Sequence, residues 1–310
     1  MIKQKKNILL IAFFLIILLV TLKLLDYFLQ KKYGLGSPII YQKSRIFGYS
    51  LKPNQETERR GKKIKINNMG MRSSSEWNFK NDNIKKILFF GDSVTYGGSI
   101  VNNSDLFSEK ICAKLNLEIN KFQCGNLGVN GYNVYSIIRN IKYKKINNED
   151  LIVITIIAND FVRSFHNIIS QPFWSKTINN SYPAFSEIFF IYLDKFRNRI
   201  KYNLGDEKQL TDIDKIYYND LIDELYDVLE TNNKPYIIFY SPTLNEIKNE
   251  EDNNFFIRIL ENKFENISNL KNISYKNKNE IYFDHVHLNK IGHEIYSEYM
   301  KDKIKNILEE

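Results

Sequence analysis

An apolar run in the first third of the chain stops abruptly at Gly91-Asp92-Ser93. The run itself, Lys86–Phe90, predicts a buried strand, and the small polar residues after it predict a tight turn. In a parallel α/β sheet such a turn lies at the carboxyl edge, where ligands bind. Ser93 is then either a nucleophile or simply the cap of a helix. If a helix follows, its free N–H groups favour negative charge that develops on a substrate.

A carboxylate and an imidazole near the end of the chain can activate such a serine. Asp284 and His287 follow a short predicted strand, Ile281–Phe283, and are close enough to meet within one turn. Histidine can take the serine proton and pass it to a leaving group, while aspartate fixes its tautomer. The alternative is a histidine that only caps a turn. His285 is the rival base, but it lacks the Leu-Asn continuation that follows His287.

Two further stretches offer hydrogen-bond donors to an oxyanion. Asn126–Gly131 follows a predicted strand, and its glycines let the backbone approach a ligand, which makes the Gly131 N–H a candidate donor. Asn159 follows the apolar run Leu151–Ile157 and places an amide at the same edge; the alternative is an Asx turn in which the next residue caps a helix. With the N–H of Ser93 they would form an oxyanion hole, where one donor is typically worth about 3 kcal/mol of barrier.

These four stretches, in this order, resemble the four blocks of the SGNH (GDSL-like) hydrolase superfamily. The resemblance covers residues 45–310 and includes Leu288–His293 after the histidine. Asn67–Arg72 is similar to a segment of membrane-associated bacterial members. By this resemblance Ser93 is the nucleophile, Asp284 and His287 complete the triad, and Ser93, Gly131 and Asn159 form the oxyanion hole.

The resemblance implies a three-layer α/β/α sandwich with a mostly parallel five-stranded sheet, related to the flavodoxin-like folds. It also implies ester hydrolysis through an acyl-Ser93 intermediate, without a cofactor. One position departs from the family: Ile157 stands where a glycine is common, two residues before Asn159. A β-branched residue does not readily adopt a positive φ, so this loop must follow a different path.

The elements that must position these residues begin at residue 86. We expect helices of ten or more residues to alternate with buried strands, which is typical of a mostly parallel sheet covered on both faces. Besides the first strand, we predict strands at Phe122–Leu127, Leu151–Ile157 and Tyr236–Tyr240, and helices at Ser104–Leu117, Val134–Lys145, Thr211–Asn232, Asn253–Glu265 and Lys290–Leu308. Residues 30–85 are predicted to be a connector, turn-prone at Tyr49–Asn54 and with an edge strand at Lys63–Asn67.

An aromatic-rich stretch, residues 161–202, interrupts the alternation and is interpreted as an insertion that covers or lines a pocket. Ordinary helix packing is the alternative fate of these rings. We expect Tyr96, Tyr132 and Trp174 to contact the substrate, and Phe173, Tyr182 and Tyr192 could stack on sugar faces or line an acyl channel. His166 and His293 are expected to be structural or surface residues.

The N-terminus predicts a membrane anchor. Lys3, Lys5 and Lys6 precede an unbroken apolar-to-neutral run from Ile8 to Leu22, and extension to Leu29 gives the length needed to span a bilayer. No small-residue cleavage site lies close enough after the run, so we favour an uncleaved signal anchor. The basic residues place residues 1–7 in the cytoplasm and the body outside the membrane, although Lys31 and Lys32 weaken this bias.

Charge and cysteine content bear on nucleic-acid binding, on disulfide formation and on metal binding. The net charge is +8, but residues 1–32 hold six Lys and one Asp, so most of the excess lies in the anchor and a nucleic-acid surface is not indicated. Cys112 and Cys124 flank a short helix-to-strand connection and fit either a disulfide or two buried thiols. No Cys/His spacing indicates a metal site.

The expected layout is thus a stub at 1–7, an anchor at 8–29, a connector at 30–85 and a hydrolase domain at 86–310. We expect a serine esterase that removes acyl groups, with O-acetyl groups favoured, from a cell-envelope glycan or lipid. Two alternatives stay open: an O-acyltransferase with the same triad and a sugar hydroxyl as acceptor, and a catalytically silent scaffold that binds glycan. The sequence does not indicate an oligomeric state.

Overall fold

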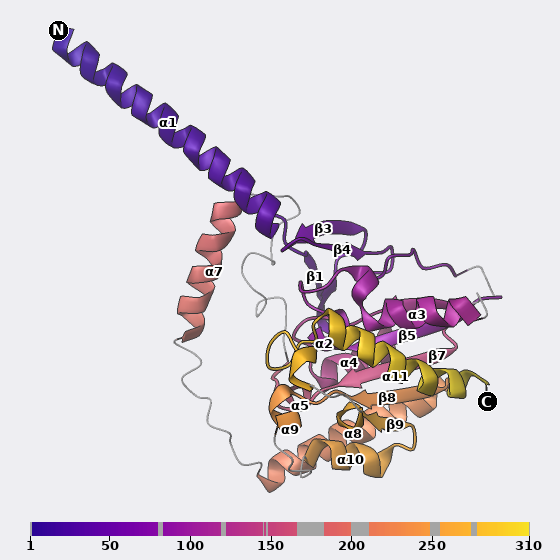
Figure 1. Cartoon of the computed structure of the whole chain (residues 1–310). Helices are drawn as coiled ribbons and strands as arrows, with labels where there is room; N and C mark the ends of the chain where they lie inside the picture. Colours follow the sequence, from indigo (N-terminus) through magenta and orange to yellow (C-terminus); the bar gives the residue numbers. More distant parts are fainter. Residues whose placement is uncertain are drawn as a thin grey trace.

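A five-stranded sheet forms the centre of the computed structural model, which describes residues 2–79, 83–118, 122–144, 146, 148–165, 183–199, 211–248, 255–273 and 278–309 (Figure 1). All its strands run parallel, in the order β6-β5-β7-β8-β9. The strands are β5 (Lys85–Gly91), β6 (Phe122–Asn126), β7 (Leu151–Ile156), β8 (Tyr236–Tyr240) and β9 (Ile267–Asn269). This order is flavodoxin-like, and the strand order reverses beside β5, where ligands bind in such folds. The predicted fold class is confirmed.

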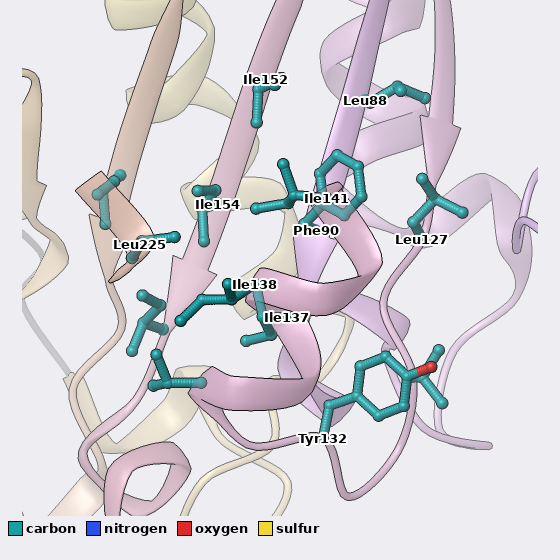
Figure 2. Packing of buried hydrophobic residues seen from close by; sticks show 14 of the residues in the cluster. Leu88, Phe90, Leu127, Tyr132, Ile137, Ile138, Ile141, Ile152, Ile154 and Leu225 are labelled. Atoms are coloured by element: carbon teal, nitrogen blue, oxygen red, sulfur yellow. The ribbon is translucent and has the colours of Figure 1, made fainter. Parts of the chain in front are cut away.

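Both faces of the sheet are covered by helices, because successive residues of each strand point to opposite sides. Leu88 and Phe90 of β5 belong to one core cluster, whereas Ile87 and Phe89 belong to the other. The first face is covered by α4 (Val134–Tyr143), α8 (Asp212–Asn232) and α10 (Phe255–Lys263), and the second by α3 (Phe107–Glu118) and α11 (Lys290–Glu309). Figure 2 shows the isoleucines of α4 packed over the first face.

The predicted strands and helices of the sheet domain agree with these elements to within a few residues, with one exception. Ile281–Phe283 is not a strand: the 3₁₀ turn η4 (Lys278–Ile281) ends there, and Tyr282 forms a single antiparallel bridge with Leu288. The fifth strand is β9 instead, which has only three residues. Its short and partly polar sequence carries little strand signal.

The segment before the sheet domain contributes to the same core. It forms two antiparallel hairpins, β1 (Tyr41–Ser44) with β2 (Gly48–Leu51) and β3 (Gln55–Arg59) with β4 (Lys62–Ile66). Tyr49, Leu51, Ile64 and Ile66 are fully buried and cluster with residues of the first face. The predicted edge strand at 63–67 corresponds to β4, whereas the turn-prone stretch at 49–54 begins within β2.

The chain begins with α1 (Ile2–Tyr33), which projects away from the sheet domain (Figure 1). Among the described residues, its segment Lys6–Tyr33 is the one helix long and apolar enough to cross a membrane, a property that a signal sequence shares. Its 28 residues correspond to about 42 Å of helix, more than the ~30 Å hydrocarbon core of a bilayer.

Cys112 of α3 and Cys124 of β6 form a disulfide, with their Cα atoms 5.8 Å apart. Their separation lies within the usual range for such a bond. Of the two possibilities that the sequence left open, the structure has the bonded pair.

Candidate active site

The turn after β5 places Ser93 at the carboxyl edge of the sheet. Ser93 opens the helix α2 (Ser93–Tyr96), and the Asp92 carboxylate caps this helix by accepting a backbone N–H at 2.8 Å. Gly91 is required before the turn, because a Cβ there would overlap the carbonyl of Thr155 on β7. Since α2 has only four residues, the helix dipole expected to favour an oxyanion is weak here.

His287 lies within hydrogen-bond distance of the serine. Its Nε2 is 2.9 Å from Ser93 Oγ, and its Nδ1 is 2.8 Å from Asp284 Oδ2. The other carboxylate oxygen of Asp284 accepts the backbone N–H groups of Val286 and His287 at 2.9 and 2.8 Å. A single tight turn therefore fixes the aspartate and the imidazole relative to each other, and the three side chains form one hydrogen-bonded chain.

The Asp284 carboxylate is stabilised in its charged form. Burial acts to raise its pKa, but hydrogen bonds from the backbone N–H groups of His287 and Val286 and from the imidazole outweigh burial and hold the pKa below its usual value. A charged carboxylate favours the tautomer with hydrogen on Nδ1, which leaves Nε2 free to accept the proton of Ser93. This is the arrangement that activates a serine hydroxyl.

Gly131 and Asn159 lie in the two loops that border the serine turn. Gly131 has φ +79°, a left-handed conformation that glycine adopts readily, in the turn between β6 and α4. Asn159 lies in the first turn of the short helix after β7. Because β6 and β7 flank β5 in the sheet, both loops open beside Ser93. The N–H of Val129 donates to the carbonyl of Gly91 at 3.2 Å and ties one loop to the serine turn.

Ile157 precedes the helix α5 (Ala158–Val162) in an ordinary extended conformation, with φ −118°. A β-branched residue adopts this φ without strain, so the loop needs no glycine at this position. Asp160 accepts the Ile157 N–H at 3.1 Å and so performs the capping that an Asx turn would provide. The side chain of Asn159 is exposed and has no hydrogen bond to another described residue, which leaves its amide available.

A charged cluster that the sequence did not indicate lies beside the serine. Arg163 Nη1 is 3.5 Å from Asp92 Oδ2 and 3.2 Å from Asp160 Oδ1, and it donates to the carbonyl of Tyr132 at 2.5 Å. Burial and the neighbouring Asp92 carboxylate raise the pKa of Asp160 well above its usual value, and Arg163 opposes this effect. Since Ser93 Oγ lies 3.2 Å from Asp92 Oδ2, one guanidinium links the serine turn to both neighbouring loops.

The predicted substrate-contacting tyrosines are core residues instead. Tyr96 and Tyr132 are 0% and 1% exposed. The Tyr96 ring packs under the guanidinium of Arg72, and the Tyr132 hydroxyl donates to the carbonyl of Tyr49 at 2.5 Å. Their burial contradicts a direct contact with substrate. Of the remaining predicted contacts, Tyr192 is exposed on a separate helix, and Trp174, Phe173 and Tyr182 lie outside the described residues. His166, which was expected to be a structural or surface residue, also lies outside them.

A cavity of about 560 Å³ is walled by the segments that follow both candidate oxyanion donors. Asn133 and Tyr135 follow Gly131, and Phe161 to Phe165 follow Asn159. Three arginines and several aromatic rings line the cavity: Arg45, Arg139, Arg163, Tyr135, Phe165 and Tyr217. The Arg139 guanidinium packs on the Tyr135 ring, 4.6 Å from its centroid. The cavity thus offers cationic donors and flat rings within a few residues of the candidate oxyanion hole.

Arg72, from the segment before the sheet domain, holds the loop that follows α2. Its guanidinium is fully buried and donates to the carbonyls of Tyr96 and Val101, both at 2.6 Å, and of Gly98. Asn103 accepts from its Nε at 3.2 Å. The loop therefore depends on a side chain that precedes Ser93 by 21 residues and belongs to a different part of the chain.

The first hairpin, formed by β1 and β2, holds the loop that carries Gly131. The Tyr49 hydroxyl donates to the carbonyl of Asn130 at 2.5 Å, and the Asn130 amide donates to the Tyr41 hydroxyl at 3.0 Å. The residues before the sheet domain thus brace two of the loops that surround Ser93.

Comparison with known families gives one match, to the model described as GDSL-like lipase/acylhydrolase, over residues 87–300. The matched region is more than half of the chain and contains Ser93, Gly131, Asn159, Asp284 and His287. No curated protein matches the chain.

Several solved structures are similar to the chain at low sequence identity. A two-domain esterase active on acetylated mannans has a TM-score of 0.44 and 13% identity, over 73% of this chain and 50% of that one. The psychrotrophic esterase EstA from Pseudoalteromonas sp. has a TM-score of 0.43 and 14% identity, over 73% and 100%. The lipase/acylhydrolase from Enterococcus faecalis has a TM-score of 0.41 and 16% identity, over 72% and 96%. The chain thus spans half the length of the first of these proteins.

Proposed function

Because the chain belongs to the GDSL-like lipase/acylhydrolase family and is an SGNH-type ester hydrolase, we propose that it removes acyl groups, chiefly O-acetyl groups, from a cell-envelope glycan or lipid through an acyl-Ser93 intermediate. The observation that carries the role of Ser93 is the hydrogen-bonded chain from Asp284 through His287 to its hydroxyl. Weak nucleophiles such as serine need a base in this position.

The reaction proceeds in two halves. Ser93 Oγ attacks the ester carbonyl carbon while His287 Nε2 takes its proton, and Asp284 stabilises the resulting imidazolium. The carbonyl oxygen becomes an oxyanion, which the N–H groups of Ser93 and Gly131 and the side-chain amide of Asn159 stabilise. The C–O bond to the alcohol then breaks and the alcohol leaves with the proton from His287. In the second half, water attacks the acyl-enzyme, His287 takes a proton from that water, and Ser93 is regenerated as the acid leaves.

The lining of the cavity, which includes segments that follow Gly131 and Asn159 in the chain, supports a polar substrate. Arginine side chains bind oxygen-rich groups through several N–H donors, and aromatic rings stack on sugar faces. A glycan ester therefore fits this lining better than a purely apolar lipid. If a sugar hydroxyl rather than water attacks the acyl-enzyme, the same site transfers the acyl group instead, and the products distinguish the two outcomes.

The proposed location is the outer side of a membrane, with α1 as an uncleaved anchor. The lysines before the apolar run favour a cytoplasmic N-terminus. The disulfide between Cys112 and Cys124 supports an oxidising compartment for the body, because such bonds are rare in the cytosol.

A fluorophosphonate probe tests the proposal on the full-length chain in detergent. We expect the wild type to be labelled and to release acetate from acetylated glycans. Ser93→Ala and His287→Ala should abolish both properties, whereas His285→Ala, which changes an exposed histidine two residues away, should keep them. A folded wild type that is neither labelled nor active would contradict the proposal and favour a binding scaffold. Transfer of acetate to an added glycan in preference to water would establish the acyltransferase.

A further inference from the structure

The helix α7 (Ala184–Arg199) carries a row of large apolar side chains that are exposed to solvent. Five large side chains form this row, with exposed fractions from 42% to 68%: Phe185, Phe189, Tyr192, Leu193 and Phe196. Their spacing of four, three, one and three residues places them within about 100° around the helix axis. A continuous exposed stripe of this kind is unusual in a soluble domain and marks an interaction surface.

The opposite face of α7 is anchored to the N-terminal hairpins. Glu187 is fully buried, and its carboxylate accepts hydrogen bonds from both terminal nitrogens of Arg59, at 2.5 and 2.9 Å. It also accepts the N–H of Gly36 at 2.6 Å, while Arg59 donates to the carbonyl of Gly34 at 2.7 Å. Bidentate pairing of arginine with carboxylate fixes orientation as well as distance. Because Glu187 fixes the other face of α7 against the hairpins, the apolar stripe points away from them.

α7 begins beside the end of α1 that joins the hydrolase domain (Figure 1). The backbone N–H of Phe185 lies 3.3 Å from Asp26 Oδ1, which accepts from it, and the two helices are in contact. Asp26 and the basic pair Lys31 and Lys32 mark the polar end of the apolar helix. The stripe thus starts where α1 passes from apolar to charged sequence, at the depth of a membrane surface if α1 spans the bilayer.

We propose that α7 lies in the outer interface of the lipid bilayer, with its aromatic stripe among the headgroups and the upper acyl chains. The partner of this face is the lipid surface itself, and the argument rests on the proposed anchoring by α1. Aromatic side chains are favoured at this depth, and a helix with one apolar face typically lies in the plane of the interface. Together α1, α7 and the Arg59–Glu187 pair attach the hydrolase domain to the membrane at two places.

Depth-dependent quenching in the full-length chain tests this inference. Single cysteines at Phe189, Phe196, Leu15 and Leu117 are labelled with an environment-sensitive maleimide dye. The disulfide between Cys112 and Cys124 leaves no native thiol among the cysteines to compete. Each variant is placed in vesicles of phosphatidylcholine and phosphatidylglycerol that carry spin-labelled lipids, with the label either near the headgroup or deep in the chains. Leu15 lies in α1, and Leu117, 87% exposed on α3, is the matched control outside the stripe.

We expect the dye at 189 and at 196 to shift to the blue and to lose most of its emission to shallow quenchers. The dye at 15 should respond to deep quenchers, and the dye at 117 to neither. If position 15 is quenched but 189 and 196 are not, the anchor stands and the inference about α7 is wrong. A blue shift at 189 without quenching would assign the stripe to contact with protein, such as a second copy, and would also overturn the inference. No quenching at 15 would refute the anchor and with it the lipid contact.

Discussion

His287 Nε2 lies 2.9 Å from Ser93 Oγ although 194 residues separate the two in the chain. Ser93 is positioned by β5, an interior strand of the sheet, and His287 by the turn that leads into α11. The two supports meet on the second face of the sheet, where α11 packs against α3 and both share a core with β5. The geometry of the site is therefore a property of the whole sandwich, and substitutions at each member should report on one distinct part of it.

Asp284→Asn tests the orientation of the imidazole. Asparagine can still accept the backbone N–H groups of Val286 and His287 through its oxygen, so the turn should persist. Its amide hydrogens then face Nδ1 and favour the wrong tautomer, with hydrogen on Nε2. We expect kcat for an aryl acetate to fall by about 10⁴-fold with little change in the melting temperature. Asp212→Asn, at an exposed position on α8, should retain full activity; equal activity of both variants would argue against the role of Asp284.

Asn159→Ala tests the oxyanion donor. The side chain is exposed and has no hydrogen bond to another described residue, so its removal should leave stability unchanged. Loss of one donor typically lowers kcat by about 10²–10³-fold, and we expect KM to change much less. Steady-state kinetics give kcat and KM, and a thermal melt gives the change in stability. A change confined to KM would assign Asn159 to substrate binding instead.

The pH dependence of stability should be governed in part by His293. Burial, followed by the positive charges of Arg72 and Lys110, lowers the pKa of His293 to about 3, and Asp105 opposes this shift. In the unfolded chain its pKa is about 6.5, so below that pH the unfolded state binds a proton that the folded state does not. Stability should therefore be unaffected by this group above about pH 7 and fall as the pH decreases, by about 1.4 kcal/mol for each pH unit between about pH 6 and the folded-state pKa of about 3.

His293→Asn is the matched variant for this prediction. The asparagine oxygen can replace Nδ1, which accepts the N–H of Phe107 at 3.2 Å. It carries no titrating group, so its melting temperature should fall less steeply between pH 6 and pH 4 than that of the wild type. Parallel curves for the two proteins would show that His293 does not provide this acid sensitivity.

Removal of the disulfide should cost stability but not activity. The bond closes a loop of 12 residues, for which the chain-entropy relation gives about 3 kcal/mol. Cys124 pairs in register with Ile87, near the amino end of β5 and away from Ser93. We expect the double variant Cys112→Ser/Cys124→Ser to melt several degrees lower, with unchanged kcat, and to be insensitive to reductant. If reductant does not lower the melting temperature of the wild type, the disulfide does not stabilise the protein.

The parts of the molecule that could be predicted from the sequence are those with strong local signals. β5, β7 and β8 each contain a run of consecutive apolar residues: Ile87–Phe90, Leu151–Ile154 and Tyr236–Tyr240. Residue types predicted that Ser93, Asp284 and His287 belong together, and the carboxyl end of β5 places Ser93 at the edge where ligands bind. The strand expected before Asp284 does not form, so Asp284 and His287 reach this edge from the turn after η4 and not from a strand end. Burial of Tyr96 and Tyr132 did not follow, since the direction of an aromatic side chain depends on what packs against it.

The contributions of Arg72 and Arg163 had no local signal. Arg163 has an acidic neighbour, Asp160, three residues earlier, but such a pair is common on helices, and its partner beside Ser93 is Asp92, 71 residues earlier. Arg72 acts on carbonyls more than 20 residues away, and backbone acceptors leave no pattern in side-chain sequence. Contacts of this type can be recognised only when the fold is known.

The Arg72 contacts also set where the catalytic unit begins. The family match starts at residue 87, and a chain cut there would keep Ser93, Asp284 and His287. It would lose the guanidinium that holds Tyr96 to Val101 and the tyrosines that hold the loop of Gly131. The structural unit around Ser93 is therefore longer than the matched family region, because its supporting contacts extend back to Tyr41 in β1. Expression fragments, domain fusions and deletions planned from the family boundary alone would remove part of the active-site scaffold.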